Sequence, residues 1–165
     1  MEYSQDAFWQ DLKSGKFMTM VRESAKGHTI ANSQEVYHVL RPMVEAHDDV
    51  ETLYGIFLDS KNHILAIEKL AEGTINSSSV YPREIVKQVL AHKAAALVLA
   101  HNHPSGSTEP SIEDKAITLR ILFVMQAMGV SLHDHIILGN GHHSMADEGL
   151  IRQMQDQLRN FMAGL

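Results

Sequence analysis

Apolar and polar residues alternate along this chain with two different periods, which predict helices and strands in turn. At the start of the chain, the helical spacing of Ala7, Phe8 and Leu12 predicts a helix that stops at residues 13–16. The next stretch, residues 17–21, fits either a short strand or a continuation of this helix. Asn32 and Glu35 form an N-cap pair that opens another helix, which should end near residues 47–49. The apolar stripe of this helix indicates core packing.

The middle of the chain predicts strands and one helix. Residues 52–59 and 64–70 predict two strands joined by a turn at residues 59–62. Residues 82–93 predict a helix that begins at a proline. Its inward-facing positions should be Ile85, Val86, Val89 and Leu90. An apolar run over residues 94–100 then has the length and composition of a buried strand.

The last third of the chain predicts a helix, a hairpin and a final helix. Residues 112–128 form a long helical pattern that stops at Gly129, a residue suited to a helix C-terminus. Residues 130–138 predict a strand, and Gly-Asn-Gly at residues 139–141 is a strong hairpin-turn signal. Residues 148–165 again have helical spacing, which suits a docking helix or a dimer contact. This order of elements predicts an α/β domain, a mixed sheet flanked by helices.

Candidate chemistry lies directly after the buried strand, in the sequence AHNHPSGSTEPSIEDK at residues 100–115. His101 and His103 are two residues apart, so in extended backbone both imidazoles face the same side. A proline and a glycine then turn the chain, and Asp114 lies in the first turn of the next helix, facing the strand end. Three protein ligands plus water are typical of catalytic zinc. The chain has no cysteine, the commonest ligand of structural zinc.

A purely structural explanation fits the same residues. Ser111 followed by Asp114 is close to a capping box, and a serine N-cap with an acid at N3 is ordinary helix chemistry. The His-Asn-His-Pro sequence alone is compatible with a polar turn. Ligand types and spacing therefore leave both a metal site and a turn plus cap open, and two imidazoles with a carboxylate also suit iron or manganese.

The pattern H-x-H-x7-S-x2-D at residues 101–114 resembles the JAMM (JAB/MPN) metalloprotease motif. The fuller string HNHPSG is similar to the RadC family within that superfamily, with Pro-Arg-Glu at residues 82–84 upstream and Asp-His-Ile-Ile at residues 134–137 downstream. The resemblance covers about residues 32–150. It implies the α/β JAB/MPN fold, which resembles that of cytidine deaminases, with an N-terminal extension and a C-terminal helix.

The resemblance also implies a role for each residue of the motif. His101, His103 and Asp114 would hold one Zn²⁺ per chain. Ser111 would stabilise an oxyanion through its hydroxyl group. Glu51 would act as general base on a water molecule that the metal activates.

The assignment of Glu51 rests on the RadC pattern, in which an acid lies seven residues before the leucine that ends a strand. Glu51 and Leu58 have this interval. From the residues alone, an acid at a strand start is more often a solvated charge. Glu68 and Glu72 are rival candidates for the general base, but neither lies at the expected interval.

Other polar residues have paired explanations. Asp134 and His135, inside a predicted strand, are either second-shell partners that orient a ligand imidazole or a buried polar pair. Arg83 either binds a substrate carboxylate or pairs with an acid, and we favour the structural role. The polar residues 73–80 predict a loop that borders or covers a substrate groove.

Length, charge and hydropathy bound the function. The length fits one domain, with residues 1–31 as an N-terminal extension and residues 32–165 as the RadC-like JAMM/MPN domain. No segment has the apolar length of a membrane span, and the acidic N-terminus does not resemble a signal peptide. We therefore expect a cytoplasmic protein. The net charge of −6, without a Lys/Arg run, argues against a main role in gripping nucleic acid.

The sequence thus predicts a zinc-dependent metallohydrolase that cleaves peptide or isopeptide bonds. In the superfamily, substrates are often peptide tails and isopeptide bonds to ubiquitin-like proteins. The alternative is a DNA repair or recombination-associated protein, or a metal-dependent nuclease, as the RadC label suggests. RadC proteins usually carry a helical DNA-binding-like region before this domain, and residues 1–31 are too few to hold it. A third hypothesis is a non-catalytic interaction module with a structural metal.

Overall fold

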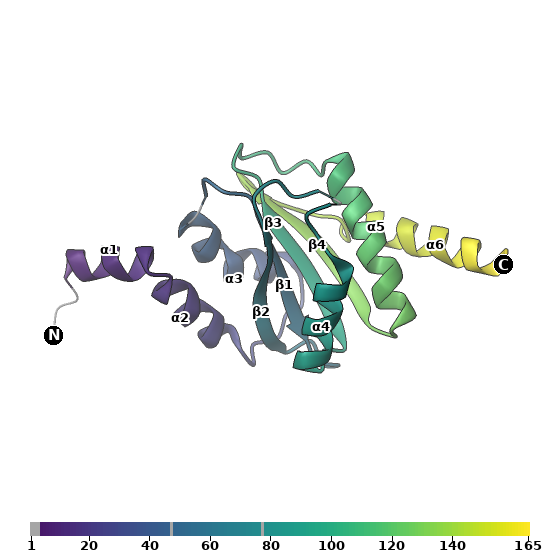
Figure 1. The fold of residues 1–165 in the computed structure, drawn as a ribbon, viewed down its shortest axis with the longest axis horizontal. Helices are drawn as coiled ribbons and strands as arrows, with labels where there is room; N and C mark the ends of the chain where they lie inside the picture. The colour runs from purple at the N-terminus through teal and green to yellow at the C-terminus, as the bar shows by residue number, and fades with distance from the viewer. Residues whose placement is uncertain (1–3, 47, 77) are drawn as a thin grey trace.

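A sheet of five strands forms the centre of the molecule (Figure 1). The computed structural model describes residues 4–46, 48–76 and 78–165. The strands are β1 (Thr52–Leu58), β2 (Ile64–Glu72), β3 (Ala96–Asn102), β4 (Ser131–Gly139) and β5 (Gly141–Ser144). Their spatial order is β2-β1-β3-β4-β5, and β3 and β4 are the parallel pair in an otherwise antiparallel sheet.

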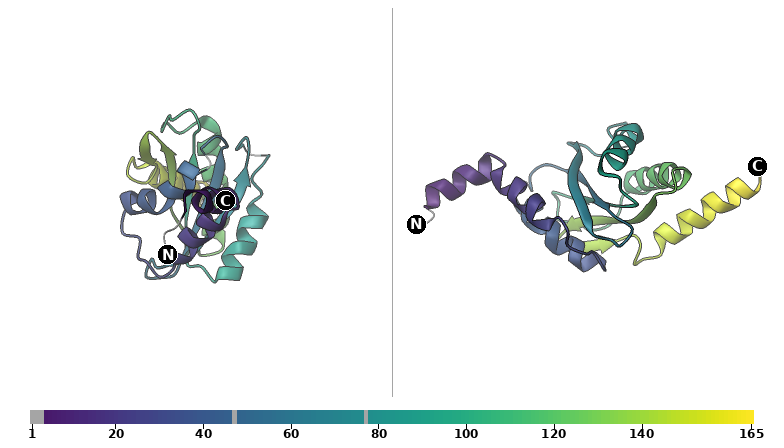
Figure 2. Two further views of the ribbon diagram at one scale, coloured as in Figure 1. Left: turned by 90° about the vertical axis from the view of Figure 1, so that its left-hand side faces the viewer. Right: turned by 90° about the horizontal axis from the view of Figure 1, so that it is seen from below.

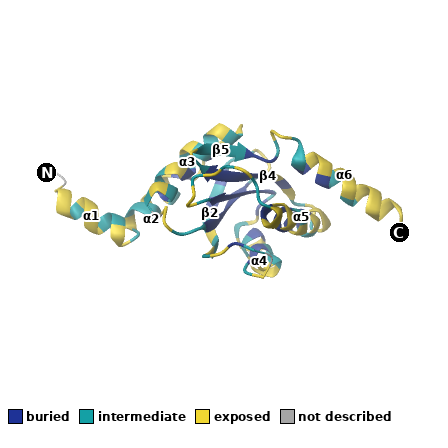
Figure 3. Ribbon diagram, turned by 90° about the horizontal axis from the view of Figure 1, so that it is seen from above, coloured by how far each residue is buried: buried dark blue, intermediate teal, exposed yellow. Residues whose placement is uncertain are grey.

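The described residues also form six helices. These are α1 (Gln5–Lys13), α2 (Lys16–Ala25), α3 (Ser33–Ala46), α4 (Pro82–His92), α5 (Ile112–Ala127) and α6 (Leu150–Ala163). α4 and α5 cover one face of the sheet, and α3 packs on the other face together with the end of α2 (Figures 1 and 3). The predicted α/β class, a mixed sheet flanked by helices, is confirmed.

Side-chain alternation along the strands divides the core between the two faces. Leu53 and Phe57 of β1 belong to the cluster under α4 and α5, whereas Tyr54 and Ile56 belong to the cluster under α3. β1 and β3 pair with Leu53 opposite His101, so His101 lies on the α5 side of the sheet.

The connection from β3 through α5 to β4 places the polar motif at one edge of the sheet. β3 and β4 are parallel, so the chain must cross over between them, and α5 makes this crossover. The C-terminal end of β3 and the N-terminus of α5 therefore meet at the same edge. In open α/β sheets, functional sites commonly lie outside the carboxyl ends of the strands.

Three local predictions need correction or completion. Residues 17–21 belong to helix α2 and form no strand, because Met18 and Val21 pack on the α3 side of the core at helical spacing. Leu90 is 64% exposed rather than inward-facing, because Ile85 and Val89 define the buried stripe and Leu90 lies to its side. α3 ends at Ala46, and the residue that follows it in the predicted helix end, number 47, lies outside the described residues.

The two terminal helices project from opposite ends of the domain (Figures 1 and 2). α6 is anchored by Ile151 and Met154, while Phe161 and Met162 in its last turn are exposed. In the described part of the chain, every helix falls short of the length and apolar character that a membrane crossing requires.

Candidate metal centre

Four side chains from separate segments meet where β3 ends. Glu51 directly precedes β1, His101 lies in β3, His103 follows β3, and Asp114 lies in the first turn of α5. Each side chain offers one nitrogen or oxygen atom, and these four atoms all lie within 4.8 Å of one another. The structure thus brings together the three predicted metal ligands and the predicted general base.

Within this group, three residues are closest to one another. The Nε2 atoms of His101 and His103 are 2.9 Å apart. Asp114 places Oδ1 at 3.1 Å from the His101 Nε2 and Oδ2 at 3.3 Å from the His103 Nε2. Glu51 Oε1 is farther away, at 3.7 Å from His101 and 4.0 Å from His103. His101 and Asp114 are buried, while the Glu51 side chain is 23% exposed, so the group opens to solvent on the Glu51 side.

Extended backbone keeps both imidazoles on one side of the sheet, as the two-residue spacing predicts. β3 ends at Asn102, but the His103 N–H donates to the Leu138 carbonyl at 2.8 Å and so prolongs the pairing with β4. Residues two apart in such a backbone point the same way.

A chain of hydrogen bonds fixes the tautomer of His101. Thr118 Oγ1 donates its single proton to the Asp114 carbonyl at 2.6 Å, so toward His135 Nδ1, also at 2.6 Å, it must accept. His135 therefore carries its proton on Nδ1, and its Nε2 accepts from His101 Nδ1 at 2.9 Å. Burial lowers the pKa of His135 well below its ordinary value, which keeps this imidazole neutral and able to accept.

His103 has the same tautomer as His101, but a different contact sets it. Its Nδ1 lies 3.0 Å from the Ser107 carbonyl, which only accepts, so Nδ1 carries the proton. The Nε2 atoms of His101 and His103 thus present two lone pairs to each other at 2.9 Å. This arrangement is repulsive unless a proton or a metal ion lies between the nitrogens. Two imidazole nitrogens beside buried carboxylate oxygens are donors that suit zinc, so the residues present can bind a metal ion.

Asp114 is aimed at the imidazoles by a capping box. The Ser111 hydroxyl accepts the Asp114 N–H at 3.0 Å, and Asp114 Oδ2 accepts the Ser111 N–H at 2.7 Å. Burial raises the pKa of Asp114. When a proton lies on the His101 Nε2, 3.1 Å from Oδ1, its positive charge and hydrogen bond, together with the Ser111 donors, outweigh burial and hold this pKa well below its usual range. The same Asp114 carboxylate therefore caps α5 and lies against both imidazoles.

Glu51 is held by two neighbouring segments. Its Oε2 accepts the Ile75 N–H at 3.3 Å from the loop after β2, and its carbonyl accepts the Gly73 N–H at 2.9 Å. Asn102, which sits between the two histidines, is buried and fixes the backbone on both sides of Glu51. Its side chain accepts the Thr52 N–H at 2.8 Å and donates to the Val50 carbonyl at 2.9 Å.

The rival acids lie elsewhere. Glu68 contacts His92 of α4 at 3.1 Å, and Glu72 pairs with Lys69 on β2. Neither belongs to the group of four. Arg83 is an exposed residue of α4 that pairs with its neighbour Glu84 at 3.5 Å.

Asp134 and His135 point to opposite faces of β4. His135 contacts His101 on the side of the metal-facing group. Asp134 instead accepts hydrogen bonds from the Ala146 N–H at 2.8 Å and from the Ser144 hydroxyl, on the α3 side. Its Oδ1 also accepts the His135 backbone N–H at 2.7 Å, so Asp134 supports the backbone of His135 and does not face the imidazoles.

Asn102 and Thr118 are two supporting residues that sequence reasoning missed. Thr118 follows Asp114 by four residues and so lies on the same face of the helix, and this contact could have been predicted from the sequence. The role of Asn102 has no local signal, because its partners lie 50 and 52 positions away.

A tight glycine contact positions the loop that holds His103. A Cβ atom on Gly139 would lie 2.4 Å from the Gly106 carbonyl oxygen and 2.9 Å from that of Ser107. The Asn140 N–H also donates to the Gly106 carbonyl at 2.8 Å. The hairpin between β4 and β5 thus packs directly against the loop whose Ser107 carbonyl orients His103.

The fold and the four-residue group define the class of protein: an α/β JAB/MPN-type domain with a group at its sheet edge that can bind a metal ion. Residues 30–150 match the RadC-like JAB domain family. The chain therefore belongs to the RadC-like JAB domain family.

Several curated relatives named UPF0758 protein are similar to this chain. One from Pseudomonas fluorescens is 40% identical over 163 residues, which cover 90% of this chain and 72% of the relative. One from Halorhodospira halophila is 41% identical over 127 residues, covering 76% and 56%. One from Vibrio atlanticus is 47% identical over 102 residues, covering 61% and 46%. The chain spans about half the length of most of the curated relatives that it matches.

Proposed function

We propose that this chain is a zinc-dependent hydrolase of peptide or isopeptide bonds, with His101, His103 and Asp114 as the zinc ligands. One observation carries the proposal: the buried His101 and the partly exposed His103, each with its proton on Nδ1, turn their Nε2 lone pairs toward each other at 2.9 Å beside an ionised carboxylate. A bound zinc ion supplies a Lewis acid that polarises a carbonyl group and lowers the pKa of water.

Glu51 is assigned to proton transfer. Its Oε1 lies farther from the imidazoles than Asp114 does, and its side chain is more exposed, so it faces the space where a substrate enters. The Ile75 N–H holds Oε2 and leaves Oε1 directed to the group. In this position Glu51 takes a proton from water and delivers it to the departing amine.

Ser111 is assigned to the stabilisation of negative charge on the substrate oxygen. Its Oγ accepts the Asp114 N–H, and its single hydroxyl hydrogen, which can also point to the Asp114 carboxylate, is the donor that a substrate oxygen would use. A fixed donor of this kind stabilises the oxyanion that forms in acyl transfer. The substrate class follows from the resemblance, as a peptide tail or a bond to a ubiquitin-like protein. The acidic net charge of −6 argues against DNA as the substrate.

The test compares two glutamate variants on a panel of fluorogenic peptides and isopeptide-linked ubiquitin. Glu51→Gln should abolish hydrolysis and keep the zinc content, whereas Glu68→Gln, a matched change outside the group, should leave both unchanged. A chelator should stop the wild-type reaction. Hydrolysis that survives both the chelator and Glu51→Gln would show that the proposed function is wrong.

A further inference from the structure

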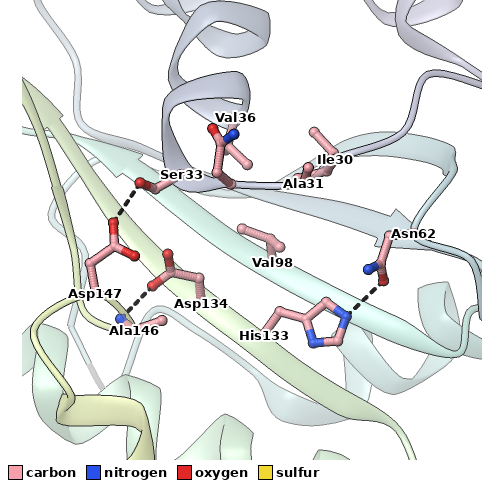
Figure 4. Close-up of a pocket in the computed structure, with 11 residues that line it drawn as sticks. Ile30, Ala31, Ser33, Val36, Asn62, Val98, His133, Asp134, Ala146 and Asp147 are labelled. Atoms are coloured by element: carbon pink, nitrogen blue, oxygen red, sulfur yellow. Dashed lines mark hydrogen bonds between the residues drawn. The ribbon is translucent and has the colours of Figure 1, made fainter.

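A cavity lies on the α3 face of the sheet, which is the face opposite His101 and Asp114. Figure 4 shows the residues that line it. Its volume is about 310 Å³, and it lies between the N-terminus of α3 and the strands β3 and β4. Val98 of β3 and Val36 of α3 form part of an apolar floor, and both belong to the core cluster on the α3 side. His101 and Asp114 lie on the other face, so this cavity shares no residue with the group of four.

A β-bulge in β4 places two polar side chains in this cavity. Leu97 pairs with Leu132, but the next residue of β3, Val98, pairs with Asp134, so His133 is an extra residue. Leu132 packs under α4 and α5, so the bulge shifts the alternation and turns Asp134 to the α3 side. Bulges of this kind re-aim side chains and are common next to functional sites.

The polar side chains that line the cavity make hydrogen bonds at two separate positions. Asp147 accepts the Ser33 hydroxyl at 2.6 Å. Asp134 is already paired with three donors: its Oδ1 accepts the His135 and Ala146 N–H groups at 2.7 and 2.8 Å, and its Oδ2 accepts the Ser144 hydroxyl. His133 Nε2 lies 2.9 Å from Asn62 Oδ1 across the cavity. Figure 4 shows the two carboxylates on one side of the floor and the His133–Asn62 pair on the other.

The lining determines the chemistry of a ligand. Two of the lining residues are aspartates and none is lysine or arginine, so an anion is disfavoured and a cation favoured. Asp147 is the exposed carboxylate of the two, whereas Asp134 is buried and its pKa is raised by that burial. The apolar floor favours an organic skeleton over a hydrated metal ion. We propose that this cavity binds a small organic amine, with its ammonium group against the exposed Asp147 and its apolar part over Val98. The inference is independent of the proposed hydrolase function.

Phenethylamine is a suitable probe, with 3-phenylpropionate as an anion of similar shape and Ca²⁺ as a simple cation. Each is titrated into the full ¹⁵N-labelled chain while amide chemical shifts are recorded. Phenethylamine should shift the amides of Val98, His133 and Ala146, and 3-phenylpropionate and Ca²⁺ should not. Equal shifts from the anion, or saturable shifts from Ca²⁺ at these amides, would overturn the proposal.

Two pairs of variants separate this site from nonspecific binding. Asp147→Asn should weaken phenethylamine binding about tenfold, because it removes a charge-assisted hydrogen bond. Asp156→Asn on α6 removes the same charge elsewhere and should have no effect. Ala31→Phe, at an exposed lining position, should block the cavity, whereas Ala127→Phe at the end of α5 should not. An affinity that is unchanged in both Asp147→Asn and Ala31→Phe would also overturn the proposal.

Discussion

Replacing Thr118 with valine should weaken zinc binding by about 10- to 100-fold although all four metal-facing side chains remain. Valine has nearly the shape of threonine and lacks the hydroxyl group. Thr118 Oγ1 makes two hydrogen bonds of 2.6 Å, one to the Asp114 carbonyl and one from His135 Nδ1. Without it, the His135 Nδ1–H is buried and unpaired.

The magnitude follows from what His135 must do. A buried donor without a partner destabilises the fold by about 1–3 kcal/mol. His135 can avoid this state by moving its proton to Nε2, but Nε2 then faces the Nδ1–H of His101 at 2.9 Å. Either outcome disturbs the orientation or the tautomer of His101. A loss of 10- to 100-fold in zinc affinity corresponds to about 1.4–2.7 kcal/mol.

The assay is a competition titration of metal-free protein with a chromophoric zinc chelator at neutral pH. Thr19→Val is the matched control, because Thr19 Oγ1 donates to the Gly15 carbonyl in the same four-residue pattern on an exposed helix. We expect its zinc affinity to equal that of the wild type. If Thr118→Val also binds zinc within about twofold of the wild type, the hydrogen-bond chain does not set the His101 tautomer and the reasoning fails.

Three further predictions test other parts of the account. Asn102→Ala should reduce kcat at constant zinc content, because Glu51 loses its backbone support; an unchanged kcat would refute this role. Gly139→Ala should lower the free energy of unfolding by about 1–3 kcal/mol in denaturant titrations, because its Cβ would collide with backbone atoms, whereas Gly164→Ala should not. Burial lowers the pKa of His133, so NMR should place its titration below pH 6.5. Because the unfolded chain then binds more protons, this residue should reduce stability as the pH falls below about 6.5, and His133→Gln should reduce that dependence.

The motif residues were predictable because local rules govern them. The two-residue spacing of His101 and His103 fixes their side in any extended strand, and the Ser111–Asp114 capping box aims Asp114 whatever the rest of the fold does. The alternation of helices and strands was likewise sufficient for the fold class. Glu51 needed the family pattern, because a strand start alone says nothing about which residues it faces.

The remaining features depend on contacts between distant residues. Asn102 reaches partners 50 and 52 positions away, and no periodicity reveals such a contact. The bulge at His133 exchanges the faces that Asp134 and His135 occupy, so strand alternation counted from Leu132 separates the two residues but puts each on the wrong face. Leu90 fits the helical stripe of α4, but the sheet beneath covers only its centre.

The metal content of the untagged protein tests the central claim most directly. Elemental analysis should find about one zinc per folded chain in the wild type. The metal should be lost in Asp114→Ala and retained in Asp147→Ala, a change of the same kind outside the group. Wild-type protein that is folded and does not take up zinc would contradict the account, and Ser111 and Asp114 would then be only a helix cap.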